Sequence, residues 1–539
     1  MKKYFFILLV LLFAITSCSS SKNHKAEQTS SQEEDKPDKL KVYAMADKVV
    51  TSRHSEGEYY YTGYTIGPFG PLANGIASQG YVLNGALGSF ESEFDIELDV
   101  HYFYQLTELE EQLIQDREQG KSPDVVILDH RGWADGNEYD NVYRLVYDEV
   151  FYDVLSYMNE DEVYESEEYF TEVLNAGKLN NKQYLIPLTF NMNAIFTSAE
   201  DVKKAGVSLE DGMRSNEILD ALGYACDTAE DGALVVNQLS QNTWAAAIIQ
   251  DYWESTGKDS IDYENETVTL DRELFEDMAV FFKQYFQMNC GEEWELLCAN
   301  ARTYMNEANW TQFSTPGYVI TLEDKIGGHC TTEEYAKAWL QEALFYYENS
   351  SLTAYRHSIA GQATALETLY TELDEQMMMI KVPMYEKENE YSAQVQMYGG
   401  VITESEYPYY GYQLLKYLMD QEYDPYYSIP INKKNAEKML DVLCTSVYTL
   451  YLSLGTAWVE EIDFTDVQDQ YVLQPMSQDT RNQLEYMLDH IGGAVMPQAG
   501  TYEAVVWHVE AYALGLESLE EAYENACIEL EEYVKYLVQ

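Results

Sequence analysis

Apolar residues between positions 40 and 129 follow two alternating spacings. In some segments they are contiguous or alternate with polar residues, as in β-strands, and in others they recur every three to four residues, as on one face of a helix. The predicted strands cover 40–45, 96–103 and 124–129, and the predicted helices cover 81–94 and 106–117. This order predicts an α/β protein with a largely parallel sheet covered by helices. Ligands bind such sheets at loops that follow the carboxyl ends of strands.

The later part of the chain is predicted to be mainly helical. The helices cover 243–255, 272–287, 333–347, 409–419 and 516–537, while strands end at 381–383 and cover 397–403. A long loop is expected at 52–80, where five aromatic residues lie among glycines. A long loop between a strand and a helix is often functional. A lid whose aromatic rings pack against one another would fit this loop equally well.

The N-terminus has the features of a secretory signal. Lys2 and Lys3 precede an almost wholly apolar run at 4–15, which is too short to span a membrane. The run leads into Ile-Thr-Ser-Cys18, which resembles the lipobox of bacterial lipoproteins. In that family the peptide is cleaved before the cysteine, which is then lipidated. The resemblance therefore implies that Cys18 anchors the chain to the extracellular face of the cell membrane through acyl chains. The alternative is an ordinary signal peptide with a chance cysteine.

The chain is strongly acidic but apolar enough to fold. Hydrophobic residues make up 46% of its 539 residues, which permits a large core and two domains. The formal net charge is −60, and it becomes −62 once the two lysines of the signal are lost. Such a surface repels phosphate backbones, so nucleic acid is not expected as a partner, and anionic ligands are disfavoured. Solubility outside the cell explains the charge more simply than a cationic ligand does.

Six cysteines follow Cys18, and no two of them have the spacing of a zinc ribbon or a thioredoxin-type motif. An exported chain can form disulfides, and the even number permits them, but six scattered cysteines can equally stay buried thiols. The sequence leaves both possibilities open. His329 and Cys330 lie beside two glycines, but two residues are too few for a metal site. No metal or other cofactor is therefore expected.

Several segments occur in an order that points to one family. They are 90–94 with 96–100, 120–128, 184–187 with 191–196, 241–244 with 260–270 and 275–286, 399–403 with 411–419, 429–433, and 516–522. Among them, Pro123-Asp-Val-Val126 and Ile429-Pro-Ile-Asn-Lys433 are similar to a strand and a turn of that family. Together, over residues 40–539, they resemble the extracellular solute-binding proteins of ATP-binding-cassette importers, in particular the sugar-binding family that includes maltose-binding protein. Residues 52–80, much of 286–355 and a stretch around 440–500 exceed the usual core of the family.

The resemblance implies an α/β, two-lobed periplasmic-binding-protein-like (type II) fold with an interlobe cleft and a hinge. The expected parts are a signal peptide at 1–17, the lipidated cysteine and a disordered linker at 18–39, lobe 1 at 40–188 and 396–440, and lobe 2 at 189–395 and 441–539. The implied function is that of a monomeric receptor without catalytic activity. It would capture a mono- or oligosaccharide and deliver it to the integral-membrane permease of the importer.

A neutral sugar is bound by aromatic faces and by side chains that hydrogen-bond hydroxyl groups. The loop after strand 124–129 offers Asp129, Arg131 and Trp133, and in the family a loop in this position holds charged and aromatic ligand contacts. These three residues are therefore candidate ligand contacts. Alternatively, Asp129 and Arg131 form an ion pair with each other and Trp133 packs locally.

Further candidates lie at the predicted crossing between the lobes and in lobe 2. Thr189 and Asn191 could bond ligand hydroxyls or could simply hold the hinge by hydrogen bonds. Asn242 and Trp244 begin a helix where the family often has an aromatic contact, although a helical tryptophan is more often part of the core. Tyr355 and Tyr398, with Trp310, are weaker candidates, because one tyrosine among 48 discriminates little.

Catalytic and other binding functions find less support. The chain has no His-Glu-x-x-His motif, no Gly-x-Ser-x-Gly elbow and no Walker loop, and its 93 acidic residues make paired carboxylates uninformative. A peptide receptor with the same two-lobed architecture is the nearer alternative. A surface enzyme that acts on polysaccharide is the more distant one.

Overall fold

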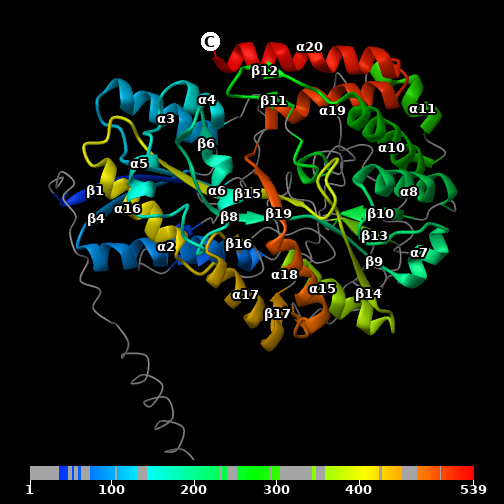
Figure 1. The fold of residues 1–539 in the computed structure, drawn as a ribbon, viewed down its shortest axis with the longest axis horizontal. Coiled ribbons are helices and arrows are strands. Elements are labelled where there is room, and N and C mark those ends of the chain that lie inside the picture. The colour runs from blue at the N-terminus through cyan, green and yellow to red at the C-terminus, as the bar shows by residue number, and fades with distance from the viewer. Residues whose placement is uncertain are drawn as a thin grey trace, which may run out of the picture. The chain divides into compact units, whose positions relative to one another are not determined.

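The fold is described from a computed structural model (Figure 1). It describes residues 36–45, 51–53, 59–61, 73–103, 106–129, 142–229, 234–238, 252–258, 260–291, 294–302, 343–347, 358–423, 428–451, 470–497 and 499–538. Residues Pro37–Gln539 form one compact unit, separate from Met1–Lys36, and all elements below belong to it. The predicted signal peptide, Cys18 and most of the linker lie outside the described residues.

A mixed seven-stranded sheet takes its strands from both halves of the chain. Its order is β16-β8-β15-β5-β1-β4, and β19 pairs with one end of β15. The strands are β1 (Lys39–Met45), β4 (Glu97–Phe103), β5 (Val125–Asp129), β8 (Ile186–Asn191), β15 (Tyr391–Val401), β16 (Ile429–Pro430) and β19 (Ile491–Val495). β4, β1 and β5 are parallel, as the alternation of strands and helices predicts. β15 runs antiparallel to β5 and β8, so the sheet is mixed rather than largely parallel.

Helices cover both faces of this sheet. In Figure 1, α2 (Ala73–Phe94) and α16 (Pro408–Met419) lie on one side of its strands and α3 (Leu106–Glu118) on the other. Two consecutive glycines of β15 permit the close approach. A Cβ at Gly399 would lie 2.4 Å from Leu415 of α16, and one at Gly400 would lie 2.4 Å from Phe151. Neighbours therefore pack directly against the backbone of β15 on both faces.

The second sheet has four strands, in the order β10-β13-β9-β14. Its strands are β9 (Ala194–Ser198), β10 (Leu234–Gln238), β13 (Ala343–Tyr347) and β14 (Met377–Lys381). The helices that pack against it are α7 (Ala199–Ala205), α8 (Ser215–Thr228), α10 (Arg272–Cys290) and α15 (Ile359–Glu372). Ser198, Asp271 and Ser358 cap three of these helices, because each side chain accepts a backbone N–H of the first turn.

The chain passes between the two sheets through short segments. Residues 192–193 join β8 to β9, and residues 382–390 join β14 to β15. The lobe boundaries expected after residues 188 and 395 fall inside β8 and β15, and both strands lie wholly in the seven-stranded sheet. The two sheets are thus joined at two places, between β8 and β9 and between β14 and β15.

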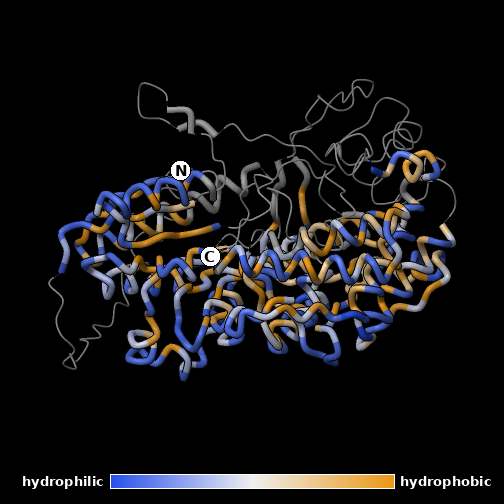
Figure 2. The backbone as a smooth tube through the Cα atoms, turned by 90° about the horizontal axis from the view of Figure 1, so that it is seen from above, coloured by the Kyte–Doolittle hydropathy of each residue, from blue (hydrophilic) through white to orange (hydrophobic). Residues whose placement is uncertain are grey.

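The remaining elements are short or lie toward the C-terminus. They are β2 (Thr51–Arg53), β3 (Tyr59–Tyr61), α4 (Val142–Tyr147), α5 (Leu155–Glu160), α6 (Thr171–Leu174), the 3-10 helix η1 (Asn175–Gly177), β6 (Lys178–Leu179), β7 (Lys182–Gln183), β11 (Ile261–Asp262), β12 (Thr267–Val268), α11 (Trp294–Ala299), α17 (Lys433–Thr445), β17 (Tyr448–Tyr451), β18 (Gln470–Leu473), α18 (Gln478–Asp489), α19 (Ala499–Ala513) and α20 (Leu519–Val538). Hydrophobic and hydrophilic residues alternate along many of the helices, as expected for elements with one buried face (Figure 2).

Several sequence-based boundaries are wrong. Residues 343–347 form strand β13 rather than the end of a helix, because they pair with β9 and β10 and bury Phe345 completely. Residues 73–80 belong to α2 rather than to a loop, and β2 and β3 pair within the remaining tyrosine-rich segment. Lys39, assigned to the linker, already pairs with Glu97 in β1.

Membrane-spanning helices and cysteine pairing were two further questions that the sequence raised. Among the described residues, no helix combines the length and the apolar character needed to cross a bilayer. The side chains of four cysteines are described, those of Cys226, Cys298, Cys444 and Cys527, and each is a free thiol. The thiol interpretation therefore holds for these four, of which Cys226 is buried and the other three are half-buried.

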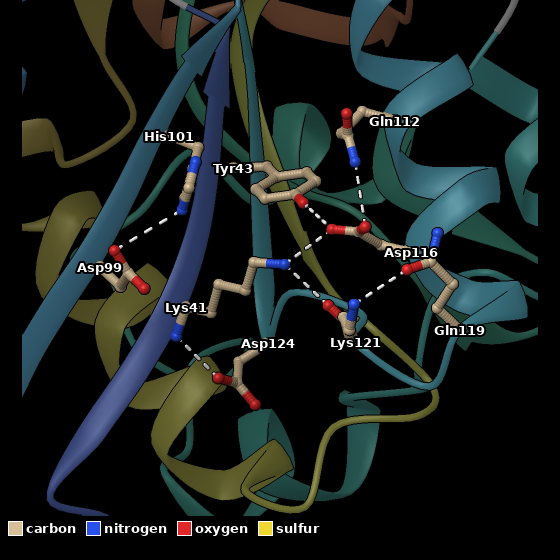
Figure 3. Close-up of polar contacts among 9 residues, drawn as sticks. All are labelled: Lys41, Tyr43, Asp99, His101, Gln112, Asp116, Gln119, Lys121 and Asp124. Atoms are coloured by element: carbon tan, nitrogen blue, oxygen red, sulfur yellow. Dashed lines mark hydrogen bonds and ion pairs between the residues drawn. The ribbon is translucent and has the colours of Figure 1, made fainter.

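A polar network fastens α3 to β1 (Figure 3). The Asp116 carboxylate accepts hydrogen bonds from Lys41 Nζ at 2.8 Å, from Gln112 Nε2 at 2.9 Å and from the Tyr43 hydroxyl. The bonds from Lys41 and Tyr43 lower the pKa of Asp116 below its usual value. Lys41 Nζ also donates to the carbonyl oxygen of Lys121 at 2.7 Å. The network thereby fixes α3 against the sheet that contains β5.

His508 joins α19 to α20. Its Nδ1 lies 2.9 Å from a carboxylate oxygen of Glu517, and its Nε2 lies 2.9 Å from one of Glu529. Burial lowers the pKa of His508, but the hydrogen bonds to Glu529 and Glu517 outweigh it, so the pKa is raised above its ordinary value. The charged imidazolium is therefore favoured in the folded protein.

We expect His508→Phe to remove a pH-dependent part of the stability. The folded-state pKa is raised, so the contribution of His508 is complete below the unfolded value of about 6.5 and is lost as pH rises through the folded value. Thermal melts between about pH 5.5 and 9 should show the melting temperature of the wild type falling relative to that of the variant. Parallel curves over this range would contradict the assignment.

Candidate functional site

Two strands end at the same part of β15 from opposite directions. β5 runs antiparallel to β15, and its last residue, Asp129, pairs with Met397. β19 runs parallel to β15, and its last residue, Val495, pairs with Gln394. Among the described strands, Gln396 therefore has no ladder partner on this edge of β15. The carboxyl ends of strands at such a change of strand direction are where open α/β sheets bind ligands.

Three buried polar side chains in this part of the sheet, two on β15 and one on the neighbouring strand β8, have no hydrogen-bond partners in the described part of the chain. Both amide atoms of Gln394 and of Gln396 are unpaired, and so is Oγ1 of Thr189. Gln394 is 4% exposed, and Gln396 and Thr189 are 0% exposed. An unpaired buried polar group costs about 1–3 kcal/mol, and native proteins keep few of them. Three such residues on two neighbouring strands therefore point to a site that a bound polar molecule completes.

The candidates Asp129 and Thr189 are brought together. Both pair with Met397, one from β5 and one from β8, so the three residues form a row across the sheet. Residues directly opposite one another in neighbouring strands share a face of the sheet. The Asp129 carboxylate and the Thr189 hydroxyl therefore stand on the same face of the sheet, on either side of Met397.

Asn191 has a structural partner. Its Oδ1 accepts a hydrogen bond from the backbone N–H of Ile359 at 2.8 Å, at the start of α15. This is the hinge-type hydrogen bond that the sequence left open for Asn191. Asn191 also pairs with Gln394 across the strands, so it borders this part of the sheet from the side of β8. Two further buried atoms, Ser392 Oγ and Gln362 Nε2, lack partners in the described structure on β15 and α15.

Tyr398 lies on the opposite face of the sheet from Asp129. It pairs with Leu128, the neighbour of Asp129 in β5, and successive residues of a strand point to opposite faces. Burial, with the nearby charges of Glu110 and Asp129, raises the pKa of Tyr398. A buried position beside α3 suits a core tyrosine better than a ligand contact.

The other candidates lie outside the described residues. They are Arg131, Trp133, Asn242, Trp244 and Tyr355, with the weaker candidate Trp310 and the pair His329 and Cys330. The ion pair expected as an alternative for Asp129 and Arg131 falls there as well.

Sequence reasoning missed Gln394 and Gln396. The expected strand at 397–403 begins after both, whereas β15 starts at Tyr391. A signal was present in the sequence Tyr391-Ser-Ala-Gln-Val-Gln-Met-Tyr398, where two glutamines one residue apart interrupt an apolar strand. In a regular strand that spacing would place both amides on one face, whereas the register of β15 against β8 shifts between Val395 and Met397. Such a pair in a buried strand is unusual.

The site can form hydrogen bonds, and no feature of it points to a metal. Within the described ranges, no three His, Cys, Asp or Glu side chains are arranged to hold a metal ion. Amide and hydroxyl groups both donate and accept, so they suit a neutral ligand with many polar groups. A separate small cavity lies between α15, α17 and α18, and all of its lining residues, such as Met192, Met439 and Leu484, are apolar. It offers nothing to such a ligand.

Comparisons with known proteins rest on structure. No family model matches the chain, and no curated protein matches its sequence. A putative oligosaccharide periplasmic-binding protein from Synechococcus sp. MITs9220, solved in complex with zinc, matches with a TM-score of 0.50 at 11% identity, over 93% of this chain and 100% of that one. The protein has the fold of periplasmic solute-binding proteins. The α/β fold class expected from the sequence is thereby confirmed.

Two de novo designed esterases also match this fold. Their TM-scores are 0.52 and 0.51, each at 12% identity, over 94% and 93% of this chain and 100% of theirs. Similarity at this level concerns the fold alone, so the designed activity of those proteins does not extend to this chain.

Proposed function

We propose that this protein is the extracellular receptor of an ATP-binding-cassette importer and captures a mono- or oligosaccharide. The observation that carries the proposal is the set of buried groups on Gln394, Gln396 and Thr189 that have no partner among the described residues, in the part of the sheet where Asp129 ends β5. Side-chain amides bond sugar hydroxyls both as donors and as acceptors, and a carboxylate accepts from them. The fold is that of periplasmic solute-binding proteins, one of which carries the name of an oligosaccharide-binding protein.

Charge favours a neutral ligand. The chain has a formal net charge of −60, which disfavours anionic solutes over its whole surface. Among the described residues, the unpaired groups of the candidate site are amides and hydroxyls rather than cations. A carbohydrate satisfies such groups without bringing a charge into a buried place, which would be costly.

We propose capture by closure of two lobes around the ligand. Because β8 and β15 lie wholly in the seven-stranded sheet, the proposed bounds move from 188 and 395. Lobe 1 would comprise 40–191 and 391–440, lobe 2 would comprise 194–381 and 441–539, and the segments 192–193 and 382–390 would form the hinge. Closure is a population shift, because the ligand contacts both lobes only in the closed form. The candidate site lies next to these segments, so small rotations there would open or close it.

The proposed location is the outer face of the cell membrane, with the receptor held as a monomer by lipid on Cys18. A membrane permease with its ATPases would be the partner, and nucleic acid would not be one. No catalytic step is proposed. Replacing Cys18 by alanine should move the protein from the membrane fraction to the medium. A variant that stays at the membrane would contradict lipid anchoring.

Thermal stability tests the ligand class. Purified residues 19–539 should melt at a higher temperature in the presence of a matching mono- or oligosaccharide. Binding to the folded state adds about 2.7 kcal/mol at a ligand concentration 100-fold above Kd. Small-angle scattering with the same sugar should show a smaller radius of gyration. Stabilisation by peptides but by no sugar would favour a peptide receptor, and release of products from glycan mixtures would favour a surface enzyme.

A further inference from the structure

Helix α4 is part of the body built on the seven-stranded sheet. Shortly after α4 the chain returns to β15, where Phe151 forms a bridge with Ile402 and the backbone N–H of Tyr152 donates to the carbonyl oxygen of Val401 at 2.7 Å. Leu145 and Val146 of α4 are buried. One side of α4 is therefore fixed to this sheet.

The opposite side of α4 contacts elements that belong with the four-stranded sheet. The hairpin β11–β12 leads into α10, and α10 packs against α8, α19 and α20. The C-terminal part of α20 lies beside α4 in Figure 1, and the two helices are in contact. Helix α4 thus connects the seven-stranded sheet with the helices around the four-stranded sheet. This contact is separate from the segments 192–193 and 382–390 that join the two sheets along the chain.

Tyrosine residues make the centre of this contact. The ring of Tyr143 stacks on that of Tyr263 in the hairpin turn, with centroids 4.0 Å apart and planes inclined by 20°. The Tyr147 hydroxyl donates a hydrogen bond to the carbonyl oxygen of Tyr263. Burial, with the charges of Glu266 and Asp262 in the same hairpin, raises the pKa of Tyr147 to about 12. Tyr147 therefore stays a neutral donor at physiological pH.

An arginine extends the contact to the C-terminal helix. The guanidinium of Arg144 lies over the ring of Tyr536 in α20, 4.9 Å from its centroid, and donates to the Tyr536 hydroxyl. Arginine over an aromatic face is attracted by the ring quadrupole. Three contacting side chains thus come from one six-residue helix, those of Tyr143, Arg144 and Tyr147.

The contact is connected to both strand ends that border the candidate site. Tyr263 Oη lies 3.2 Å from Oγ1 of Thr501, in the first turn of α19, which follows β19 closely in the chain. On the other side, α4 is the first described element after Asp129 at the end of β5. A movement that separates the two sheets must therefore break these contacts.

We propose that Tyr143, Arg144 and Tyr147 form a latch with Tyr263 and Tyr536 that holds the protein closed in the absence of ligand. The inference rests on the proposed function, because capture by closure requires an open form. These side chains are positioning residues, since they act by setting the population of the closed form. Loss of the latch lowers the fraction of molecules competent to bind, and the apparent Kd rises by the same factor.

Small-angle scattering of ligand-free protein tests the latch. The double variant Arg144→Ala/Tyr147→Phe removes a cation and one hydroxyl hydrogen bond but leaves the buried rings in place. A matched control is Lys416→Ala/Tyr164→Phe, which removes the ion pair with Asp161 and the hydrogen bond to Gln183 around the seven-stranded sheet. The radius of gyration should increase in the first variant and stay at the wild-type value in the control.

Affinity gives the second readout. A sugar that binds the wild type should bind Arg144→Ala/Tyr147→Phe about tenfold more weakly and restore the compact form. Tyr263→Ala should open the protein further. An unchanged radius of gyration in both variants, with cooperative unfolding, would overturn the latch. If no carbohydrate binds the wild type, the proposed function fails, while the ligand-free comparison still decides the latch.

Discussion

The variant Gln396→Met is expected to be more stable than the wild type and to lose ligand binding. Gln396 is fully buried, and among the described residues neither atom of its amide has a partner. Methionine has a similar volume and no polar group to desolvate, so the free energy of unfolding without ligand should rise by about 1–3 kcal/mol. Loss of two hydrogen bonds to the ligand should weaken binding about 100-fold. Denaturant titration and calorimetry measure the two effects.

The matched control is Gln183→Met. Gln183 is also fully buried, but its Nε2 donates to the carbonyl oxygens of Leu174 at 3.1 Å and Leu185 at 2.5 Å, and its Oε1 accepts from Tyr164 at 2.6 Å. The same substitution there leaves these partners without their hydrogen bonds, so the free energy of unfolding should fall by about 2–4 kcal/mol. If both variants lose stability equally, Gln396 has a structural role and the candidate site is wrong.

Removal of the Asp116 carboxylate is expected to have the second largest effect. Asp116→Ala leaves the hydroxyl of Tyr43 without its acceptor and the ammonium of Lys41 with only the carbonyl oxygen of Lys121, in a mostly buried place where these side chains fasten α3 to β1 (Figure 3). The free energy of unfolding should fall by about 2–3 kcal/mol, as measured by denaturant titration at pH 7. Ligand affinity, measured under conditions where both proteins are fully folded, should change little, because the network lies away from Gln396.

Asp99→Asn is the control for charge alone. Asp99 pairs with Lys39 at 3.3 Å on the surface, where both side chains are nearly half exposed, so its loss should cost less than about 0.5 kcal/mol. The pH dependence gives a second check. The pKa of Asp116 is lowered, so its contribution is present above the unfolded value and is lost as pH falls through the folded value. The difference between wild type and Asp116→Asn should therefore shrink below about pH 4. A difference that stays constant would show that Asp116 acts through packing.

Local sequence patterns predicted the elements whose partners are near in the chain. The parallel strands β1, β4 and β5 follow one another with helices between them, so spacing and order sufficed to place them. Residues 343–347 show the limit. Their aromatic and apolar residues fit a helix equally well, and only pairing with β9 and β10 makes them a strand.

The sequence predicted only part of the candidate site. Asp129 and Thr189 follow from strand ends and from the resemblance to a known family, whereas Gln394 and Gln396 looked like ordinary polar residues. The structure shows that β5 and β19 both end beside β15, and that the two buried amides there have no partner among the described residues. No spacing along the chain contains that information, because β5 and β19 lie far apart in sequence.

By itself, the sequence determined the α/β class, the order of the early strands and helices, and a strongly acidic composition that disfavours anionic partners. These properties depend on residue type and on contacts over a few positions, which a single chain displays directly. The tertiary structure decided which strands end beside β15, which buried polar groups lack a partner within the described ranges, and that α4 contacts Tyr263 and Tyr536. Burial and pairing between distant segments set these features, since a polar side chain is costly or useful only according to what surrounds it.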